Sequence, residues 1–512
     1  MTFAPTFPER FNMARYFLDE RVEEGRGDAT AIIDDAGRYS YRDVQALANR
    51  VGGALRARGV GPEDRVLIGL GDGVEFAAAF FGVLKIGAVV TMVNPELPDA
   101  DYRYYLDYTR ARAFIAERAL ADRIRPQIES SPLLRALITV GGDGGGGERW
   151  EDSVGREPPE LENWDTSKDD PSVWLFTSGS TGKPKAAVHL HHDFPYNTEC
   201  YAKQVLALGA GDRTLGVPKL FFGYATGTDL MFPFAVGATA ILFRDKATPE
   251  GLFDLIERHR PTVLTSVPTM INKMVQAGGP ASLAPLRCCI SAGEALPEEL
   301  YRRWMQRWNV EILDGIGSAE LFHIYISNRF GEVKAGSLGR LVPGYEARVV
   351  GADGRDVPDG EIGTLWVKGD SAALCYWQAH EKSKEVLRGD WVVSGDLFRR
   401  DEAGYFYYAG RADDMLKVGG IFVAPTEVEA CLARHPNVHE VAVVGFEDED
   451  GLVKPLAFVV ARDAQPSEAL AQSIVEHAKR ELARYKAPHR VEFVAELPRS
   501  DRGKILRREL RK

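Results

Sequence analysis

Two kinds of segment alternate along the chain up to about Gly410. The first clear pair is 41–58, where apolar residues recur at helical spacing between Val44 and Leu55, followed by the short apolar segment 65–70. A helix with one buried face followed by a buried strand is the repeating unit of a sheet covered by helices. The pattern therefore predicts an α/β domain built from such units.

A weak internal sequence similarity, or echo, suggests that this domain contains two related halves. The segments 80–93 and 232–243 each read as a helix end, a Gly-Ala turn and a strand. Two related α/β subdomains would produce this echo, although any helix-turn-strand unit has a similar pattern.

The longest apolar segment, 76–93, is interrupted by Gly82, Lys85 and Gly87. It is better explained by a helix followed by a buried strand than by a membrane span. Charged residues break every apolar cluster of 1–17, so a signal-peptide core is missing there. We expect no membrane-spanning segment, no membrane partner and a cytoplasmic protein.

The pattern changes after Gly410, where strands and helices form a smaller α+β unit. Its predicted elements are a helix at 425–434, strands at 441–446 and 456–461, an amphipathic helix at 467–485 and a strand at 490–494. This unit is large enough to fold by itself. The predicted fold class is α/β: a large N-terminal domain of helix-covered β-sheets, 1–411, and a small mobile C-terminal α+β domain, 412–512.

Composition narrows the classes of protein. The 512 residues are too many for one compact core, and a net charge of −11 argues against a surface that coats nucleic acid. The five cysteines lack a C-x-x-C spacing, so neither a disulfide framework nor a structural zinc site is indicated. We expect no nucleic-acid partner and a reducing compartment.

The segment TSGSTGKPK, 177–185, directly follows the apolar run 173–176. Only two residues separate Gly179 from the Gly-Lys pair, and Pro184 follows the lysine, so the spacing differs from that of a P-loop NTPase. Backbone N–H groups, hydroxyls and Lys185 in such a loop can still surround a polyphosphate. A Ser- and Gly-rich segment of this kind is also typical of a linker.

The segment resembles the phosphate loop of the adenylate-forming superfamily, which includes acyl-CoA synthetases and luciferase-like enzymes. Further segments match motifs of that superfamily in the same order. They are SAGE (291–294), DGIGSAE (314–320), SGD (394–396), GRADD (410–414) and PRSDRGK (498–504). The resemblance implies an acid–thiol ligase with two half-reactions: a carboxylate reacts with ATP to give an acyl-adenylate and pyrophosphate, and a thiol then displaces AMP.

The resemblance also assigns roles to individual residues. Glu320 would bind Mg²⁺, and Lys504 would stabilise charge in the transition state of the first step. Lys417 would belong to the loop that enters the site for the second step, after the small domain rotates about a hinge at Asp413. The nucleotide and CoA would contact Thr177, Ser178, Gly179, Ser180, Thr181, Gly182, Lys185, Gly293, Glu294, Asp314, Gly315, Ile316, Asp396, Arg411, Gly419 and Gly420. Among these, Gly293, Glu294 and Asp314 would line the adenine site, and Asp396 would accept hydrogen bonds from the ribose hydroxyls.

Two positions depart from the common motif of the superfamily. Ile316 stands where an aromatic residue is frequent, and Ala319 stands where a threonine is frequent. Adenine would thus meet an aliphatic surface and one phosphate hydroxyl contact would be missing, which puts nucleotide affinity in question.

The segments 217–227 and 320–324 are similar to benzoate-CoA ligases. That likeness implies a flat pocket for an aromatic acid, with Gly223 and Tyr224 as one wall and His323 near the far ring edge. The implied acid is benzoate or a substituted benzoate such as anthranilate or hydroxybenzoate. Histidines and tyrosines are also common as satisfied core residues.

Two other functions stay open at this point. The same adenylating chemistry could load the phosphopantetheine of a carrier protein, or the chain could be a non-catalytic sensor of a nucleotide or acid. The expected small-molecule partners are the aromatic acid, ATP, Mg²⁺ and CoA, and a homodimer is compatible with the resemblance. The cluster His189, His191 and His192 is better explained by structural use than by metal binding.

Overall fold

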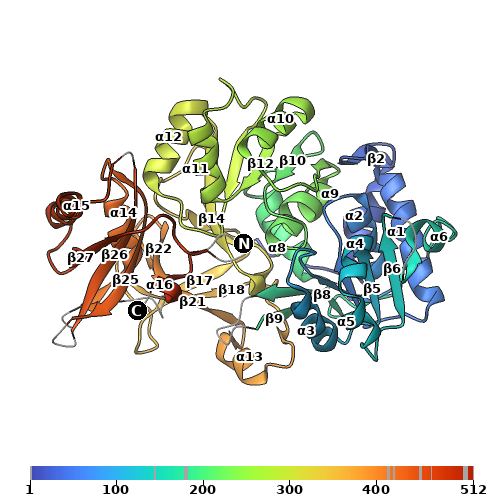
Figure 1. Cartoon of the computed structure of the whole chain (residues 1–512). Helices are drawn as coiled ribbons and strands as arrows, with labels where there is room; N and C mark the ends of the chain where they lie inside the picture. The colour runs from blue at the N-terminus through green and yellow to red at the C-terminus, as the bar shows by residue number, and fades with distance from the viewer. Residues whose placement is uncertain are drawn as a thin grey trace.

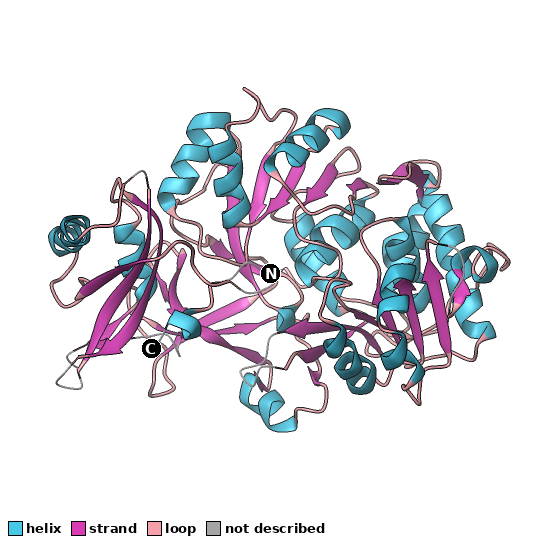
Figure 2. Cartoon of the chain, in the orientation of Figure 1, coloured by secondary structure: helices cyan, strands magenta, loops and turns pink. Residues whose placement is uncertain are grey.

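The computed structural model describes residues 3–142, 146–177, 183–411, 416–418, 421–448, 452–462, 464–499 and 505–510. Two large sheets and their helices form most of the N-terminal part, and a smaller unit follows at the C-terminus (Figures 1 and 2). This confirms the predicted fold class.

The first sheet has a parallel centre and two antiparallel strands at one edge. In spatial order its described strands are β19 (Cys375–Tyr376), β9 (Lys185–Leu190), β8 (Pro171–Thr177), β4 (Val89–Met92), β3 (Arg65–Gly69), β5 (Ala113–Glu117), β6 (Ala136–Val140) and β7 (Glu148–Arg149). The strand predicted at 65–70 is β3. Thr177 and Lys185 pair in register, so the two ends of the phosphate-loop segment are held together by β8 and β9.

The second sheet is also parallel at its centre and antiparallel at both edges. In spatial order its described strands are β16 (Arg340–Leu341), β15 (Ile324–Ser327), β14 (Glu311–Gly317), β13 (Cys288–Ser291), β12 (Val263–Ser266), β10 (Arg213–Gly216), β11 (Thr239–Ile241), β1 (Thr30–Ile33) and β2 (Arg38–Ser40). The carboxyl ends of β12, β13 and β14 lie at one edge, where α/β folds place their ligands.

Helices cover both sheets (Figure 2). The longer ones are α1 (Tyr41–Ala57), α2 (Val74–Lys85), α3 (Asp99–Thr109), α10 (Pro249–His259), α11 (Pro268–Ala277) and α12 (Glu298–Trp308). The short ones are α4 (Arg118–Arg123), α5 (Arg125–Glu129), α6 (Trp150–Ser153), α7 (Asp193–Asn197), α8 (Gly223–Thr226), α9 (Phe232–Val236) and α13 (His380–Val386). Short π-helical turns are η1 (Arg15–Asp19), η2 (Val22–Arg26), η3 (Thr198–Lys203) and η4 (Gly227–Met231).

The segment 76–93 forms the C-terminal part of α2, a turn and strand β4, as predicted. Gly82 lets α1 pack closely on α2, because a Cβ there would lie 2.7 Å from the carbonyl oxygen of Ala48. Lys85 is buried, but its Nζ lies 2.5 Å from Oδ1 of Asp19, which compensates its charge. Every described helix is too short or too polar to cross a membrane.

The echo between 80–93 and 232–243 has a structural counterpart. α2 leads through Gly87 into β4 of the first sheet, and α9 leads through Gly237 into β11 of the second sheet. Both glycines have a left-handed backbone, with φ of 72° and 73°. The two halves therefore use the same helix-turn-strand unit once in each sheet.

A third, antiparallel sheet follows the two large ones along the chain. Its described strands are β17 (Glu346–Val350), β18 (Gly363–Lys368), β21 (Trp391–Arg400), β20 (Leu387–Arg388) and β22 (Phe406–Arg411). The predicted joint between the domains and its hinge, Asp413, lie outside the described residues.

The C-terminal unit has its own apolar core. Its described elements are β23 (Leu416–Val418), β24 (Ile421–Val423), α14 (Pro425–Leu432), β25 (Val438–Glu447), β26 (Val453–Ala461), α15 (Glu468–Glu481), β27 (Arg490–Phe493) and α16 (Arg507–Leu510). The five elements predicted between 425 and 494 are all present. Ser467 begins α15 by accepting a hydrogen bond from the N–H of Leu470, and Ile474 and Ala478 of its apolar face are buried.

Candidate active site

Glu320 lies where the two large sheets meet, in the 3-10 turn η5 (Ala319–Leu321) that follows β14. Its Oε1 accepts a hydrogen bond from the Tyr376 hydroxyl at 2.5 Å. The same tyrosine ring lies 4.6 Å from Nζ of Lys185, at the start of β9. The structure thus brings together the predicted metal ligand and the lysine that ends the phosphate-loop segment.

Lys185 is partly buried at this position, and burial lowers the pKa of its ammonium. Lys382 acts in the same direction, whereas the Glu320 carboxylate opposes the shift. A partly desolvated cation beside a carboxylate is suited to bind an anion that also carries a metal ion.

His189 holds the backbone next to Glu320. Its Nε2 lies 2.7 Å from the carbonyl oxygen of Ala319, and its Nδ1 lies 2.7 Å from Oδ2 of Asp193. His191 accepts a hydrogen bond from the N–H of Met13, and His192 contacts the carbonyl oxygen of Lys168. The three histidines thus contact protein groups, and no cluster of potential metal ligands is found among the described residues.

The candidate adenine residues follow the carboxyl ends of β13 and β14. Gly293 has φ of +89° and open space around the position of a Cβ. Both carboxylate oxygens of Glu294 accept from the Thr269 hydroxyl, at 3.1 and 2.8 Å. Gly315 permits the close approach of β15, because a Cβ there would lie 2.6 Å from the carbonyl oxygen of Ile326.

Asp314 is buried in β14, and burial raises the pKa of its carboxyl to about 8, although the Ser291 hydroxyl lowers it. Within the described part of the chain its Oδ1 has no hydrogen-bond partner. A buried polar atom of this kind is costly unless a ligand or water satisfies it. Asp314 therefore offers a hydrogen-bonding atom for a polar ring edge.

Ile316 and Ala319, the two departures from the common motif, both pack against the main apolar core and are partly exposed. That adenine meets this aliphatic surface stays a prediction.

Asp396 lies in β21, directly opposite Arg411 of β22. Its N–H donates to Oγ of Ser394 at 2.8 Å, which shapes the strand at this point. Tyr325 of β15 is close to both acidic site residues: burial raises its pKa, and the carboxylates of Asp396 and Glu320 raise it further. The predicted ribose ligand and the predicted metal ligand therefore flank one buried tyrosine.

Gly223 and Tyr224 lie at the start of α8 and form a compact group with His323. The Tyr224 and His323 rings are 5.3 Å apart between centroids, and Nε2 of His323 is 3.0 Å from the carbonyl oxygen of Tyr224. A Cβ at Gly223 would lie 3.0 Å from the end of the Leu175 side chain of β8, so a larger residue there would require Leu175 to shift. The predicted pocket residues are thus neighbours in space.

His323 is fully enclosed by aromatic rings, and burial lowers its pKa to about 3. The imidazole is therefore neutral near pH 7. A carbonyl oxygen can only accept, so Nε2 carries the proton and Nδ1 is an acceptor. Within the described residues this Nδ1 has no hydrogen-bond partner, which leaves a buried, unsatisfied acceptor among the rings of Tyr201, Tyr224 and Phe232.

Comparison with known proteins agrees with this geometry. A model of the family described as AMP-binding enzyme matches residues 18–377, and a model of the AMP-binding enzyme C-terminal domain matches residues 427–504. The chain belongs to the AMP-binding enzyme family. The resemblance inferred from the sequence is confirmed.

Relatives of this AMP-binding enzyme act on aromatic acids. It is 42% identical to the benzoate–CoA ligase of Thauera aromatica over 98% of this chain and 96% of that protein. The solved anthranilate CoA ligase AuaEII in complex with anthranoyl-AMP matches with a TM-score of 0.92 and 38% identity, over 98% and 97% of the two chains. A benzoate CoA ligase of Burkholderia xenovorans LB400 matches with a TM-score of 0.89 and 41% identity, over 98% and 100%.

Several predicted residues of this AMP-binding enzyme lie outside the described structure. They are Ser178, Gly179, Ser180, Thr181, Gly182, Asp413, Gly419, Gly420 and Lys504. For Arg411 and Lys417 the backbone is described, in β22 and β23, but not the side chain. Their roles stay predictions.

Tyr376 and Tyr325 were missed by the sequence analysis. Neither lies in one of the matched motifs, and each reaches the site through strand pairing: β19 pairs with β9, and β15 pairs with β14. The strand Ile324–Ser327 is buried at every position, and no local pattern of the sequence indicated which carboxylates would lie beside Tyr325.

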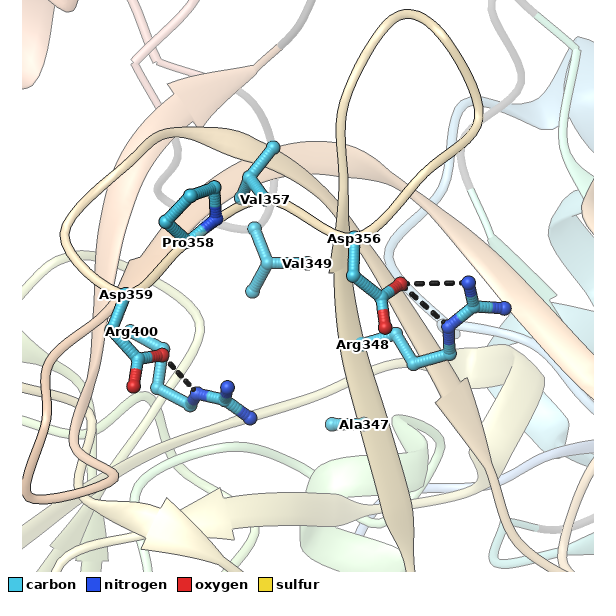
Figure 3. A pocket seen from close by; sticks show the side chains of 8 residues that line it. All are labelled: Ala347, Arg348, Val349, Asp356, Val357, Pro358, Asp359 and Arg400. Carbon is cyan, nitrogen blue, oxygen red and sulfur yellow. Dashed lines mark hydrogen bonds and ion pairs between the residues drawn. The ribbon is translucent and has the colours of Figure 1, made fainter.

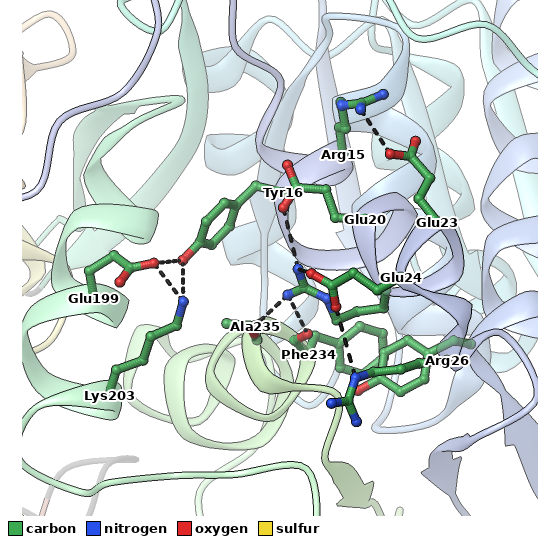
Figure 4. A network of polar contacts seen from close by, with 12 residues as sticks. Arg15, Tyr16, Glu20, Glu23, Glu24, Arg26, Glu199, Lys203, Phe234 and Ala235 are labelled. Atoms are coloured by element: carbon green, nitrogen blue, oxygen red, sulfur yellow. Dashed lines mark hydrogen bonds and ion pairs between the residues drawn. The ribbon is translucent and has the colours of Figure 1, made fainter.

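Two surface hollows of this AMP-binding enzyme lie apart from the candidate residues. One contains the ion pairs Arg348–Asp356 and Arg400–Asp359, at 2.7 and 2.8 Å (Figure 3). The other lies beside η1, where the Tyr16 hydroxyl and the Lys203 ammonium both donate to Glu199 (Figure 4). In both, charged groups already pair with protein partners.

Proposed function

We propose that the chain is an ATP- and Mg²⁺-dependent aryl-CoA ligase that forms aryl-AMP from benzoate or a substituted benzoate. A carboxylate oxygen of the acid attacks the α-phosphorus of ATP, and pyrophosphate leaves. The thiol sulfur of CoA then attacks the acyl carbon, AMP leaves and the thiol proton is released. The observation that carries the proposal is the compact group of Gly223, Tyr224 and His323, in which His323 follows Glu320 by three positions. The chain that holds this group is 42% identical to a benzoate–CoA ligase.

The residues around Glu320 fit a hard cation. Its carboxylate is partly exposed at the end of a strand, with one oxygen oriented by Tyr376, and oxygen donors are what Mg²⁺ prefers. When bound, Mg²⁺ would neutralise phosphate charge. Lys185 would bind a phosphate oxygen, and Oδ1 of Asp314 would form a hydrogen bond with the polar edge of adenine.

The enclosed acceptor of His323 favours acids with a hydrogen-bond donor on the ring. Nδ1 of a neutral imidazole accepts from an amino or hydroxyl group but makes no such bond to unsubstituted benzoate. A site that leaves a buried polar atom unpaired with one substrate discriminates against it. Anthranilate or a hydroxybenzoate is thus the proposed preferred class.

Replacing His323 by phenylalanine keeps a ring among Tyr201 and Phe232 but removes both the acceptor and the Nε2 hydrogen bond to the Tyr224 carbonyl. We expect kcat/KM to fall about 10-fold more for an amino- or hydroxybenzoate than for benzoate, because the lost bond to Tyr224 affects both acids and the lost acceptor affects only the substituted one. Steady-state thioester formation with both acids measures the ratio. An equal fall for both would mean that His323 only supports the wall.

The proposed activity is tested with a panel of aryl and alkyl acids, each incubated with ATP, Mg²⁺ and CoA. We expect pyrophosphate release and an aryl-CoA product of the correct mass with benzoate-class acids, and thioester formation without any added carrier protein. A preference for medium-chain fatty acids would overturn the aryl assignment. Adenylate formation without transfer to CoA would favour a carrier-protein acceptor.

A further inference from the structure

A short series of polar contacts joins the C-terminal unit to the loop of the candidate adenine site. Nη1 of Arg499 donates to Oγ1 of Thr269 at 3.3 Å. Thr269, at the start of α11, donates in turn to Glu294 at 2.8 Å. Glu294 directly follows Gly293, so the series ends on the loop after β13.

Arg499 is also held by contacts within the C-terminal unit. Its Nη2 donates to Oε1 of Glu440 in β25 at 2.9 Å, and both side chains are about three-quarters buried, with 26% and 29% exposed. Its backbone forms an isolated β-bridge with Ile505, and the N–H of Leu506 donates to the carbonyl oxygen of Pro498 at 2.8 Å. Arg499 is therefore part of the C-terminal unit and extends from it to Thr269.

The β-bridge connects Arg499 to the neighbourhood of Lys504 along the chain. Ile505 directly follows Lys504, the lysine that the resemblance assigns to the first half-reaction. A contact that holds Arg499 against the large domain therefore also restrains Ile505, the residue after Lys504. The chain matches solved complexes with anthranoyl-AMP and with ATP at TM-scores of 0.92 and 0.88, each over 98% of its length. Both units are therefore placed as in an enzyme that holds the nucleotide of the first half-reaction.

We propose that Arg499 is a positioning residue for aryl-AMP formation, acting through Thr269 and Glu294. This rests on the proposed function with its two half-reactions, and on the rotation of the small domain between them that the resemblance implies. Arg499 to Thr269 is a contact between the two units, so a rotation breaks it, whereas Arg499 to Glu440 lies within one unit and persists. The contact therefore stabilises the arrangement for the first half-reaction and contributes nothing to the second.

Two variants remove the contact from opposite sides. Thr269→Val keeps the shape of the side chain and leaves the Arg499–Glu440 pair intact, and Arg499→Met keeps the apolar stem. We expect each to slow aryl-AMP formation by about 10-fold, as for loss of a hydrogen bond to a charged group. Thioester formation from synthetic benzoyl-AMP and CoA is expected to stay within about twofold. Lys486→Met, which breaks the Lys486–Glu427 pair inside the C-terminal unit, is the matched control and should leave both half-reactions unchanged.

The double variant decides whether the two residues act through one contact. We expect it to form aryl-AMP no more slowly than the more affected single variant, because either substitution alone already removes the contact between the two units. Multiplying effects, or an equal slowing of both half-reactions, would overturn the proposal. If the unsubstituted protein forms no aryl-AMP from any acid, the proposed function itself fails. If the unsubstituted protein is active and both Thr269→Val and Arg499→Met form aryl-AMP at its rate, only the proposal for Arg499 fails.

Discussion

Replacing Lys504 by alanine is expected to lower the rate of aryl-AMP formation by about 10²- to 10³-fold. The first half-reaction brings a carboxylate and a triphosphate together, and negative charge grows on the oxygens around the α-phosphorus. A lysine over this position stabilises that charge in the transition state more than in the ground state. Pyrophosphate release with ATP, Mg²⁺ and the preferred acid measures the effect.

The same variant should keep most of its activity in the second half-reaction. Under the proposed rotation of the C-terminal unit, Lys504 leaves the site before the thiol attacks, so synthetic benzoyl-AMP and CoA should still give thioester at nearly the normal rate. Lys486→Met serves again as the control, because it removes a lysine from the same unit. Normal pyrophosphate release by Lys504→Ala would contradict the assignment.

This experiment also separates an enzyme from a non-catalytic sensor. A sensor would bind the nucleotide and acid without releasing pyrophosphate, and Lys504→Ala would change only affinity. The position of Glu320, whose carboxylate is held by Tyr376 close to Lys185, favours catalysis.

Local pattern predicted several elements of the large domain and the main elements of the C-terminal unit. The helix at 41–58, the helix and strand within 76–93 and the five elements of the C-terminal unit all occur close to their predicted places. In each, apolar spacing and the adjoining glycines, serines or prolines act in the same direction. The motifs also indicated which residues gather at the candidate site, since they follow the carboxyl ends of strands that lie side by side in a sheet.

Contacts between distant segments were beyond the sequence pattern. Tyr376 meets Glu320 because β19 pairs with β9, and Arg499 meets Thr269 across 230 positions of the chain. Periodicity shows that a segment is a strand, but the neighbour of an edge strand is decided by the packing of the whole domain. The acceptor on His323 was likewise hidden, because its protonation depends on burial and on the carbonyl of Tyr224.

Replacing Glu320 by glutamine is the second change with a large expected effect. The amide keeps the size of the side chain but lacks the charge that a hard cation requires. We expect aryl-AMP formation to fall by about 10²-fold or more and to need a higher Mg²⁺ concentration, since phosphate charge is then poorly neutralised. Pyrophosphate release measured across a Mg²⁺ titration gives both quantities.

Tyr376→Phe is the matched control for this prediction. It removes only the hydroxyl that orients Glu320 at 2.5 Å and leaves the carboxylate and its charge in place. Loss of one hydrogen bond should slow the reaction by about 10-fold or less, with little change in the Mg²⁺ requirement. If Glu320→Gln shows the normal rate and the normal Mg²⁺ dependence, the metal is held elsewhere. If the tyrosine variant is as impaired as the glutamine variant, the orientation of Glu320 matters as much as its charge, because the tyrosine variant keeps the anion and loses only the hydrogen bond that orients it.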